Sequence, residues 1–256
     1  MRRAIATATL ALALFGPGLA PAQEQSRPAL SDMTEVEREA FRTEVRAYLL
    51  EHPEVLMEAI QILEARRDAD ARAADAEMIA ANREQLLHDP NSWVGGNPDG
   101  DVTLVEFSDY RCGFCKKAHP ELEELLLRDP NLRLVVKEFP ILGPDSVAAA
   151  RMATAALDLD PSKYAALNGS LMSFEGQLTE AAGYQIASAV GYDVAALKER
   201  AASAEVEARI ADTYALARSL GLEGTPSFVL GNQILRGYLP IERMLGVVAE
   251  ARAATN

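Results

Sequence analysis

Two cysteines stand two positions apart near the middle of this chain, Cys112 and Cys115, and they are the only ones among its 256 residues. An apolar run that predicts a strand precedes them, and a run that predicts a helix follows. A Cys-x-x-Cys sequence at such a turn is typical of a redox dithiol. At the first turn of a helix, unpaired backbone N–H groups and the positive end of the helix dipole favour a thiolate. Because a thiolate attacks disulfide sulfurs, the pattern predicts Cys112 as the attacking sulfur and Cys115 as the resolving one.

A structural zinc site and an inert disulfide are the alternative interpretations of the cysteine pair. A zinc site needs two further ligands, and the chain offers only three histidines, His52, His88 and His119. None of them forms a second ligand pair at finger-like spacing, so we expect them to be ordinary polar or packing residues. The structural disulfide stays open at this point, although the position between strand and helix favours the redox dithiol.

The segments around the cysteine pair predict a sheet with helices. Apolar runs with turn signals on either side predict strands, and alanine-rich or amphipathic stretches predict helices. The expected strands are residues 101–107, 132–138, 227–230 and 233–236, and the expected helices are residues 115–128, several within about 144–220, and 240–251.

Three separated pieces of sequence carry a resemblance to a known family. They are residues 105–115, residues 135–140 (Val-Val-Lys-Glu-Phe-Pro) and residues 224–229 (Gly-Thr-Pro-Ser-Phe-Val). The chain resembles the bacterial DsbA-like thiol–disulfide oxidoreductases, and within them the suppressor-of-copper-sensitivity protein C branch. The resemblance implies an α/β thioredoxin fold with a large helical insertion at about 144–220.

The resemblance also implies a buried acid behind the dithiol. Glu106 stands six residues before Cys112 within an apolar strand, and in this family such an acid helps to move protons to and from the resolving cysteine. The alternative is a solvent-facing residue of an edge strand. Burial would raise the pKa of Glu106, and Lys137 on the next strand is expected to oppose that as its partner.

Substrate is expected to bind beside the cysteines. By resemblance, Thr225 and Pro226 form a cis peptide that faces the cysteine pair, and the Thr225 backbone pairs with an extended substrate strand. The alternative for Pro226 is a proline at the first position of a strand, where no N–H donor is needed. Gly113 and Phe114, between the cysteines, complete the expected substrate-binding residues.

The N-terminal part of the chain divides into two expected segments. Residues 1–22 have the charge, apolar run and small-residue pattern of a secretory signal, with cleavage after Ala22. Residues 23–90 predict a helical segment that precedes a catalytic domain at 91–256. Thr34 with Glu37 has a capping-box pattern, and a helix with apolar Phe41, Val45, Tyr48 and Leu49 on one face should end at Pro53.

The apolar stripe of this helical segment needs a partner, because two short helices cannot bury it alone. It packs either on the catalytic domain or on copies of itself. The resemblance favours the second alternative, since this branch of the family carries an N-terminal helical segment that makes oligomers. We therefore expect a homo-oligomer through residues of about 31–63.

The composition and the two residues between the cysteines limit which functions are compatible with the sequence. A formal net charge of −13 argues against nucleic acid as a partner. Gly113 and Phe114 add no charge that would stabilise the thiolate, and with Thr225 and the self-associating N-terminus they resemble the isomerase and reductase side of the family. The expectation is a periplasmic protein thiol–disulfide oxidoreductase that leans to isomerisation, uses no cofactor, acts on proteins with cysteines or disulfides, and is reset by a membrane-embedded redox partner.

Two alternatives to isomerisation remain at this stage. The first is a dithiol oxidase of the same class, which introduces disulfides. The second is a copper-tolerance protein, because the two thiolates of Cys112 and Cys115 are a good soft site for Cu(I). A specialised copper protein would add methionine or histidine ligands near the pair, and residues 105–120 contain only His119.

Overall fold

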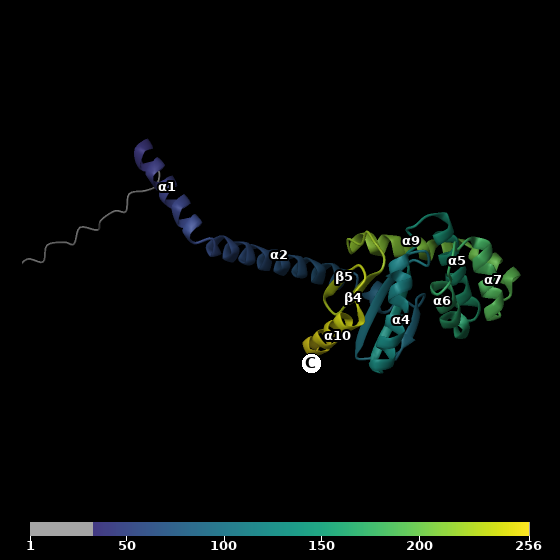
Figure 1. The fold of residues 1–256 in the computed structure, drawn as a ribbon. Helices are drawn as coiled ribbons and strands as arrows, with labels where there is room; N and C mark the ends of the chain where they lie inside the picture. Colours follow the sequence, from purple (N-terminus) through teal and green to yellow (C-terminus); the bar gives the residue numbers. More distant parts are fainter. Residues whose placement is uncertain (1–32, 256) are drawn as a thin grey trace, which may run out of the picture. The chain divides into compact units, whose positions relative to one another are not determined.

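The computed structural model describes residues 33–255 as two compact units that divide between Ile62 and Leu63 (Figure 1). The expected signal sequence and its cleavage site lie outside the described residues. No helix between residues 33 and 255 is long and apolar enough to cross a membrane.

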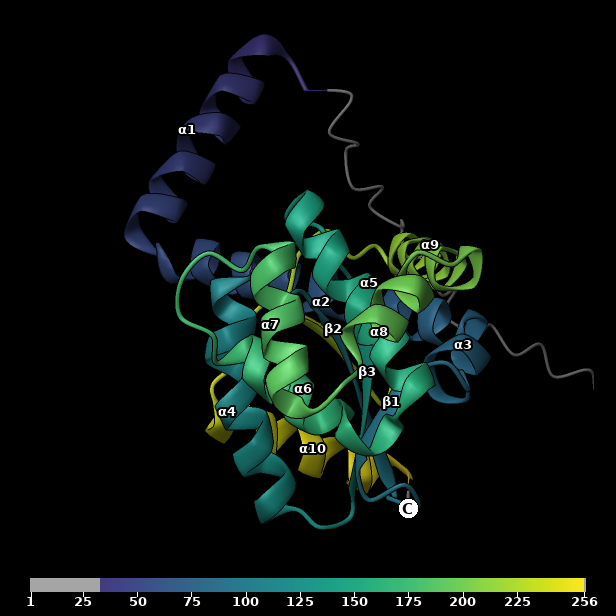
Figure 2. The ribbon, with the colours of Figure 1, turned by 90° about the vertical axis from the view of Figure 1, so that its right-hand side faces the viewer.

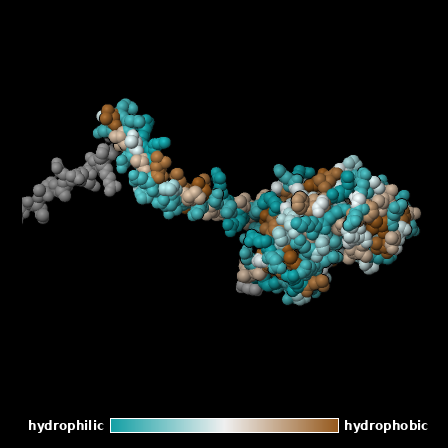
Figure 3. Space-filling view, in the orientation of Figure 1, coloured by the Kyte–Doolittle hydropathy of each residue, from teal (hydrophilic) through white to brown (hydrophobic). Residues whose placement is uncertain are grey.

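The first unit consists of helix α1 (Glu35–Glu51) and the beginning of α2 (Glu54–Ala81). The expected capping box is present: the Glu37 backbone donates to the Thr34 hydroxyl, and the Thr34 backbone donates to the Glu37 carboxylate. No residue of α1 is buried. The side chains of Phe41, Val45 and Tyr48 are exposed on one face of the helix, and Figure 3 shows hydrophobic residues at the surface of this unit.

The second unit contains a five-stranded mixed sheet in the order β1-β3-β2-β4-β5. Strand β2 pairs in parallel with β3 and antiparallel with β4, and both edge strands, β1 and β5, pair antiparallel with their neighbours. The strands are β1 (Trp93–Gly96), β2 (Val102–Ser108), β3 (Leu132–Glu138), β4 (Ser227–Leu230) and β5 (Gln233–Arg236).

Helices cover both faces of this sheet (Figure 2). On one face, α4 (Gly113–Arg128) and α10 (Ile241–Thr255) pack against even-numbered β2 and β3 residues such as Leu104 and Val136. On the other face, Val105 and Phe107 pack with Ile79 of α2, Leu86 of α3 (Arg83–Leu87) and Leu216 of α9 (Ala204–Ser219).

The remaining helices form the insertion between β3 and β4, and their core includes both cysteines. This confirms the expected thioredoxin fold with a helical insertion. The members of the insertion are α5 (Pro144–Leu159), the short 3₁₀ helix η2 (Pro161–Lys163), α6 (Tyr164–Met172), α7 (Glu180–Val190), α8 (Val194–Ala201) and α9.

The structure adds two features that the sequence analysis did not predict and differs from it in a third place. Gly95 and Gly96 lie in strand β1, which pairs with β3. Residues 194–219 form two helices, α8 and α9, because Ser203 caps the second. Residues 63–90, expected with the N-terminal segment, pack with the second unit through Ile79 and Leu86. A functional division near residue 90 therefore stays a prediction.

Candidate active site

The turn from β2 into α4 places the two cysteines at the start of a helix. Cys112 is the N-cap residue of α4, and its carbonyl oxygen accepts the first helical hydrogen bond from Lys116 N at 3.0 Å. The Cys112 side chain is 7% exposed, whereas Cys115 is fully buried. Both thiols are free. Only Cys112 can therefore meet a protein substrate directly, as the sequence predicts.

The two thiols have opposite electrostatic surroundings. A hydrogen bond from the Cys115 thiol, together with the backbone N–H groups of Phe114 and Cys115, lowers the pKa of Cys112 to about 5. The same bond to Cys112 and the burial of Cys115 raise the pKa of Cys115 far above its ordinary value. At neutral pH, Cys112 is therefore a thiolate and Cys115 a thiol, which is the state that an attacking and a resolving sulfur require.

The loop before β4 closes over Cys112. The Thr225–Pro226 peptide is cis, as expected. The Cys112 sulfur lies 3.2 Å from the Thr225 carbonyl oxygen. Pro226 is buried, whereas Thr225 is only partly buried. The backbone of Thr225 thus borders the attacking sulfur.

The surface beside Cys112 is aromatic and carries a positive charge. Phe114 is 62% exposed, and its ring stacks on Tyr238 with 6.4 Å between the ring centroids. The Lys117 ammonium lies 4.1 Å from the centre of the Tyr238 ring. Gly113 is exposed, and a side chain there would meet no atom within 4 Å. Gly113 and Phe114 therefore leave open space next to the attacking sulfur.

Glu106 lies inside the fold and not at a solvent-facing edge. Its side chain is 4% exposed, and its register on β2 puts it on the face covered by α4. Burial, together with the nearby Cys112, raises the pKa of Glu106 to about 7. The Ser108 hydroxyl lowers the pKa of both Glu106 and Cys115, which puts Ser108 near both groups. Sequence reasoning missed Ser108, whose only signal is its place at the end of β2.

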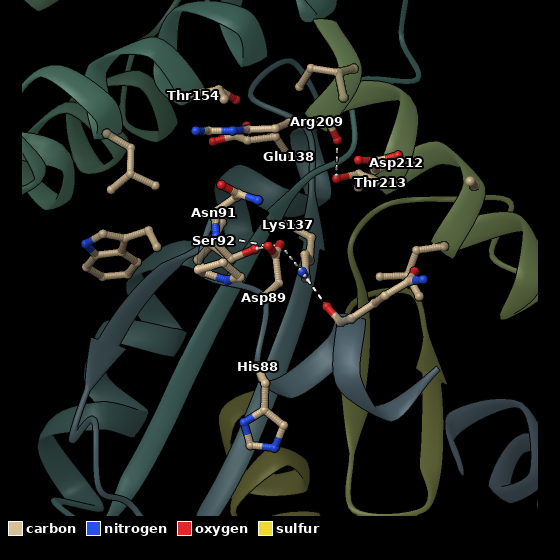
Figure 4. A pocket seen from close by; sticks show the side chains of 18 of the residues that line it. His88, Asp89, Asn91, Ser92, Lys137, Glu138, Thr154, Arg209, Asp212 and Thr213 are labelled. Atoms are coloured by element: carbon tan, nitrogen blue, oxygen red, sulfur yellow. Dashed lines mark hydrogen bonds and ion pairs between the residues drawn. The ribbon is translucent and has the colours of Figure 1, made fainter. Parts of the chain in front are cut away.

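The expected pairing of Lys137 with Glu106 is wrong. The parallel register aligns Glu106 with Val136 and Phe107 with Lys137, so the two charged side chains lie on opposite faces of the sheet. The Lys137 ammonium donates to Asp89 Oδ2 and to the Gln85 carbonyl oxygen, both at 2.7 Å (Figure 4). Lys137 therefore ties the segment after α3 to the sheet and does not share the site of the dithiol.

Asp109 is a further residue that the sequence analysis did not single out. It is 1% exposed, and its carboxylate accepts hydrogen bonds from Arg111 N, Ile141 N, Leu142 N and Ser146 Oγ at 2.8 to 3.0 Å. These bonds join the turn before Cys112 to the loop between β3 and α5. An aspartate directly after an apolar strand was the available signal, since such residues organise turns.

Replacing Glu106 with glutamine is expected to change the pH dependence of stability. Because the pKa of Glu106 is about 7 in the folded protein and about 4.5 when unfolded, folding favours its protonated form. Its contribution to stability is full below about pH 4.5 and is lost as the pH rises through 7. Between pH 4 and pH 8, the wild type should therefore lose ~3 kcal/mol more unfolding free energy than Glu106→Gln. Urea unfolding at both pH values measures this, and parallel losses in the two proteins would contradict a buried carboxyl.

Comparisons with known families agree with this geometry. Residues 103–249 match the model described as the DSBA-like thioredoxin domain, and residues 37–69 match the copper resistance protein ScsC N-terminal domain. A thioredoxin-like oxidoreductase from Silicibacter pomeroyi is 44% identical, with 67% of this chain and 98% of that chain covered and a TM-score of 0.65. A linker-deletion variant of Proteus mirabilis ScsC is 25% identical, with 88% of this chain and all of that chain covered and a TM-score of 0.67.

Curated relatives add two further similarities, both partial. The Na(+)/H(+) antiporter NhaA 1 of Salinispora arenicola is 29% identical over 64% of this chain, which spans about a quarter (25%) of that protein. The thiol:disulfide interchange protein DsbC of Salmonella typhimurium is 26% identical over 62% of this chain and 55% of its own length. The family match covers more than half of the chain, and it coincides with the sheet and helices that hold the cysteine pair. The chain therefore belongs to the DSBA-like thioredoxin domain family, in its ScsC branch.

Proposed function

We propose that this protein is a periplasmic thiol–disulfide oxidoreductase that acts mainly as a disulfide isomerase or reductase on other proteins. The observation that carries the proposal is the pairing of an N-cap thiolate with a buried thiol. Cys112 has a pKa of about 5 and borders the partly exposed Thr225 backbone, while Cys115 is fully buried behind it. The predicted signal sequence supports the periplasm, where disulfide chemistry is needed.

The reaction begins when the Cys112 thiolate attacks a disulfide sulfur of the substrate. A bond forms between Cys112 and that sulfur, and the second substrate sulfur leaves as a thiolate. In isomerisation, another substrate thiolate attacks the mixed disulfide and releases Cys112 unchanged. In reduction, Cys115 gives up its proton, attacks the Cys112 sulfur and releases the substrate thiolate, which leaves Cys112 and Cys115 joined as a disulfide.

Glu106 is the proposed acceptor of the Cys115 proton. A carboxyl with a pKa of about 7 can take up or release a proton near neutral pH. Ser108 Oγ is buried and has no hydrogen-bond partner among the described residues, and its hydroxyl influences the pKa of both Glu106 and Cys115, which supports Ser108 as a free group that could pass the proton between them. Glu106 is inaccessible to substrate, so its role is to move the proton within the protein.

The dipeptide between the cysteines sets the direction of the reaction. Gly113 and Phe114 add no positive charge to the Cys112 thiolate, so the dithiol form gains less stability than with a histidine there. When the dithiol form is less stable, the disulfide form of the protein is a weaker oxidant of other proteins. This supports isomerisation or reduction over the introduction of disulfides, and an isomerase must be kept reduced by an electron donor, proposed here as a membrane-embedded partner.

Placing histidine at position 114 tests this direction. The Phe114 ring is 62% exposed, so Phe114→His should leave the core unchanged and put a positive charge beside the Cys112 sulfur. We expect the equilibrium constant with glutathione to shift about tenfold toward the dithiol, which is ~30 mV more oxidising. The measurement is the reduced fraction at a series of glutathione ratios. Phe114→Leu is the control, and equal potentials for all three proteins would contradict control by this dipeptide.

Copper binding is a second candidate function. It is favoured by the match of residues 37–69 to a copper resistance protein domain and by the two adjacent thiols. Within residues 33–255, no group of three or more His, Cys, Asp or Glu side chains could hold a metal ion. Titration of the reduced protein with Cu(I) against a competing chelator tests this candidate: tight binding at a fixed stoichiometry would favour copper handling, and loss of all Cu(I) to the chelator would argue against it.

A further inference from the structure

The second unit contains a cavity of about 410 Å³ that neither cysteine lines (Figure 4). It lies among α3, the segment from α3 to β1, the end of β3, α5 and α9. This volume is within the range of small-molecule sites. The lining includes the apolar residues Val136, Leu157 and Ile210. Nothing in the thiol–disulfide chemistry proposed above uses this cavity.

The cations of the cavity are already paired. Lys137 is 3% exposed and bonds to Asp89, and Arg209 bonds to Asp158 Oδ1 at 2.6 Å. Asp89 also accepts from the Ser92 hydroxyl at 2.8 Å. The positive charges of Lys137 and Arg209 are therefore neutralised by these carboxylates, which leaves little positive charge for an anionic ligand.

The acids of the cavity have no such partners. Across the described residues, no lysine, arginine or histidine nitrogen lies within 4.0 Å of the carboxylates of Glu138, Asp212 or Glu84. Figure 4 shows Glu138 and Asp212 on the side of the cavity formed by β3 and α9. Three carboxyl groups of the lining are therefore without an ion pair, whereas Lys137 and Arg209 each have one, so an entering cation can pair with a carboxyl group without displacing an existing partner.

An aromatic wall adds a second attraction for cations. Trp93 stacks on Tyr164 with 5.3 Å between the ring centroids, and both side chains line the cavity. The face of a tryptophan ring attracts ammonium and guanidinium groups. Trp93 and Tyr164 thus place an aromatic surface in the same cavity as the Glu138 carboxyl group and the exposed Asp212 carboxylate, a combination that suits an organic cation.

We propose that this cavity binds a small organic cation, a primary amine or guanidine, between Glu138, Asp212 and the Trp93 ring. Glu138 also connects the cavity to the active-site turn: its Oε1 accepts hydrogen bonds from Tyr164 at 2.6 Å and from Tyr110 at 2.7 Å. Tyr110 stands two residues before Cys112. A ligand on Glu138 therefore touches a group that is hydrogen-bonded to that turn.

Proton release would accompany the binding. Burial raises the pKa of Glu138 to about 8, so the free carboxyl holds a proton for much of the time at pH 7. A bound cation favours the carboxylate and expels that proton. Of the groups around Glu138, Tyr110 and Tyr164 have raised pKa values and stay protonated, and Asp89 has a lowered pKa and stays ionised. The charges of Asp109, in the turn after β2, and of Glu106, on β2, also raise the pKa of Glu138. The other charged or titratable residues of the lining are Lys137, Arg209, Asp212, Glu84 and His88.

The test uses the whole chain with 1,4-diaminobutane and agmatine as cationic probes and glutarate as an anion of similar length. Trp93 is the only tryptophan of the protein and lines this cavity, so its fluorescence reports on binding there, and the lining variants below separate this cavity from the neighbouring hollow that Trp93 also borders. We expect a saturable fluorescence change with the cations and none with glutarate or with sodium chloride at equal ionic strength. Calorimetry at pH 7 in buffers of different ionisation enthalpy should show that a proton is released.

Variants of the lining make the result specific. Glu138→Gln should weaken binding at least about tenfold and remove the proton release, since a charged hydrogen bond is lost. Asp212→Asn, on the exposed surface of α9, should weaken binding without risk to the core. Glu199→Gln on α8 is the matched control and should change nothing. The proposal is overturned if no probe gives a saturable change up to ~10 mM, if glutarate binds equally, or if both lining variants bind like the wild type.

Discussion

Replacing Cys112 with serine is expected to abolish thiol–disulfide exchange, whereas replacing Cys115 is expected to trap substrate. The reason is the difference in burial and charge: Cys112 has the lowered pKa and is 7% exposed, whereas Cys115 is fully buried. Without Cys112 no thiolate reaches the substrate, so reduction of a disulfide-bonded peptide should fall to the uncatalysed rate. Without Cys115 the mixed disulfide forms and cannot be resolved within the protein.

The measurement is mass spectrometry of each variant after mixing with a disulfide-bonded peptide. Cys115→Ser should carry a peptide adduct on Cys112, and Cys112→Ser should carry none. Reduced wild type, which resolves its adducts, is the control. Adducts on Cys115 in the Cys112→Ser variant would reverse the assignment of the two sulfurs.

Charges on the apolar face of α1 are expected to convert the protein from an oligomer to a monomer. Phe41 and Tyr48 are 46% and 52% exposed on one face of a helix that buries no residue. A second copy of this helix would cover that face, so the double variant Phe41→Asp with Tyr48→Asp should place charges in the interface. Light scattering should give a monomer mass for the variant and a multiple of it for the wild type.

Arg46→Asp is the matched control, since it changes charge on another face of the same helix and should leave the oligomer intact. Because the cysteine pair and its sheet lie in the second unit and α1 lies in the first, the double variant should keep its reactivity toward a small disulfide peptide. A wild-type protein that is already a monomer would contradict self-association, and the apolar face of α1 would then need another partner.

Much of the second unit follows from local patterns. The strands at 132–138, 227–230 and 233–236 have the bounds that their apolar runs and turns predict, because neighbours along the chain decide them. These strands depend on periodicity and on short-range turn signals, which a sequence displays directly. The burial of Glu106 agrees with what the family resemblance implied, whereas the local pattern left a solvent-facing position open.

Features set by the packing of distant segments could not be predicted in this way. Trp93–Gly96 is a strand because it pairs with β3, although two glycines in four residues indicate a turn. The side of the sheet on which Lys137 lies depends on the register between β2 and β3, which alternation along one strand does not reveal. Asp109 acts through bonds to residues more than thirty positions away. Likewise, Ile79 and Leu86 join the second unit because β2 and α9 bury them.

Truncation at residue 90 is therefore a poor way to isolate the catalytic unit. It would remove Leu86, which is fully buried, and Asp89, the partner of buried Lys137. An unpaired buried ammonium costs about 3 kcal/mol or more. Point variants of α1 avoid this problem and separate self-association from stability.

Reactivation of a model protein with scrambled disulfides tests the central claim most directly. The assay compares the wild type with the Phe41→Asp, Tyr48→Asp variant in glutathione buffer that keeps Cys112 reduced. We expect the wild type to restore activity, and the monomeric variant to react with disulfides but to reshuffle them poorly, since isomerisation would use several dithiols in one assembly. If neither protein reshuffles while both oxidise a reduced substrate, the protein is a dithiol oxidase and the assignment as an isomerase is wrong.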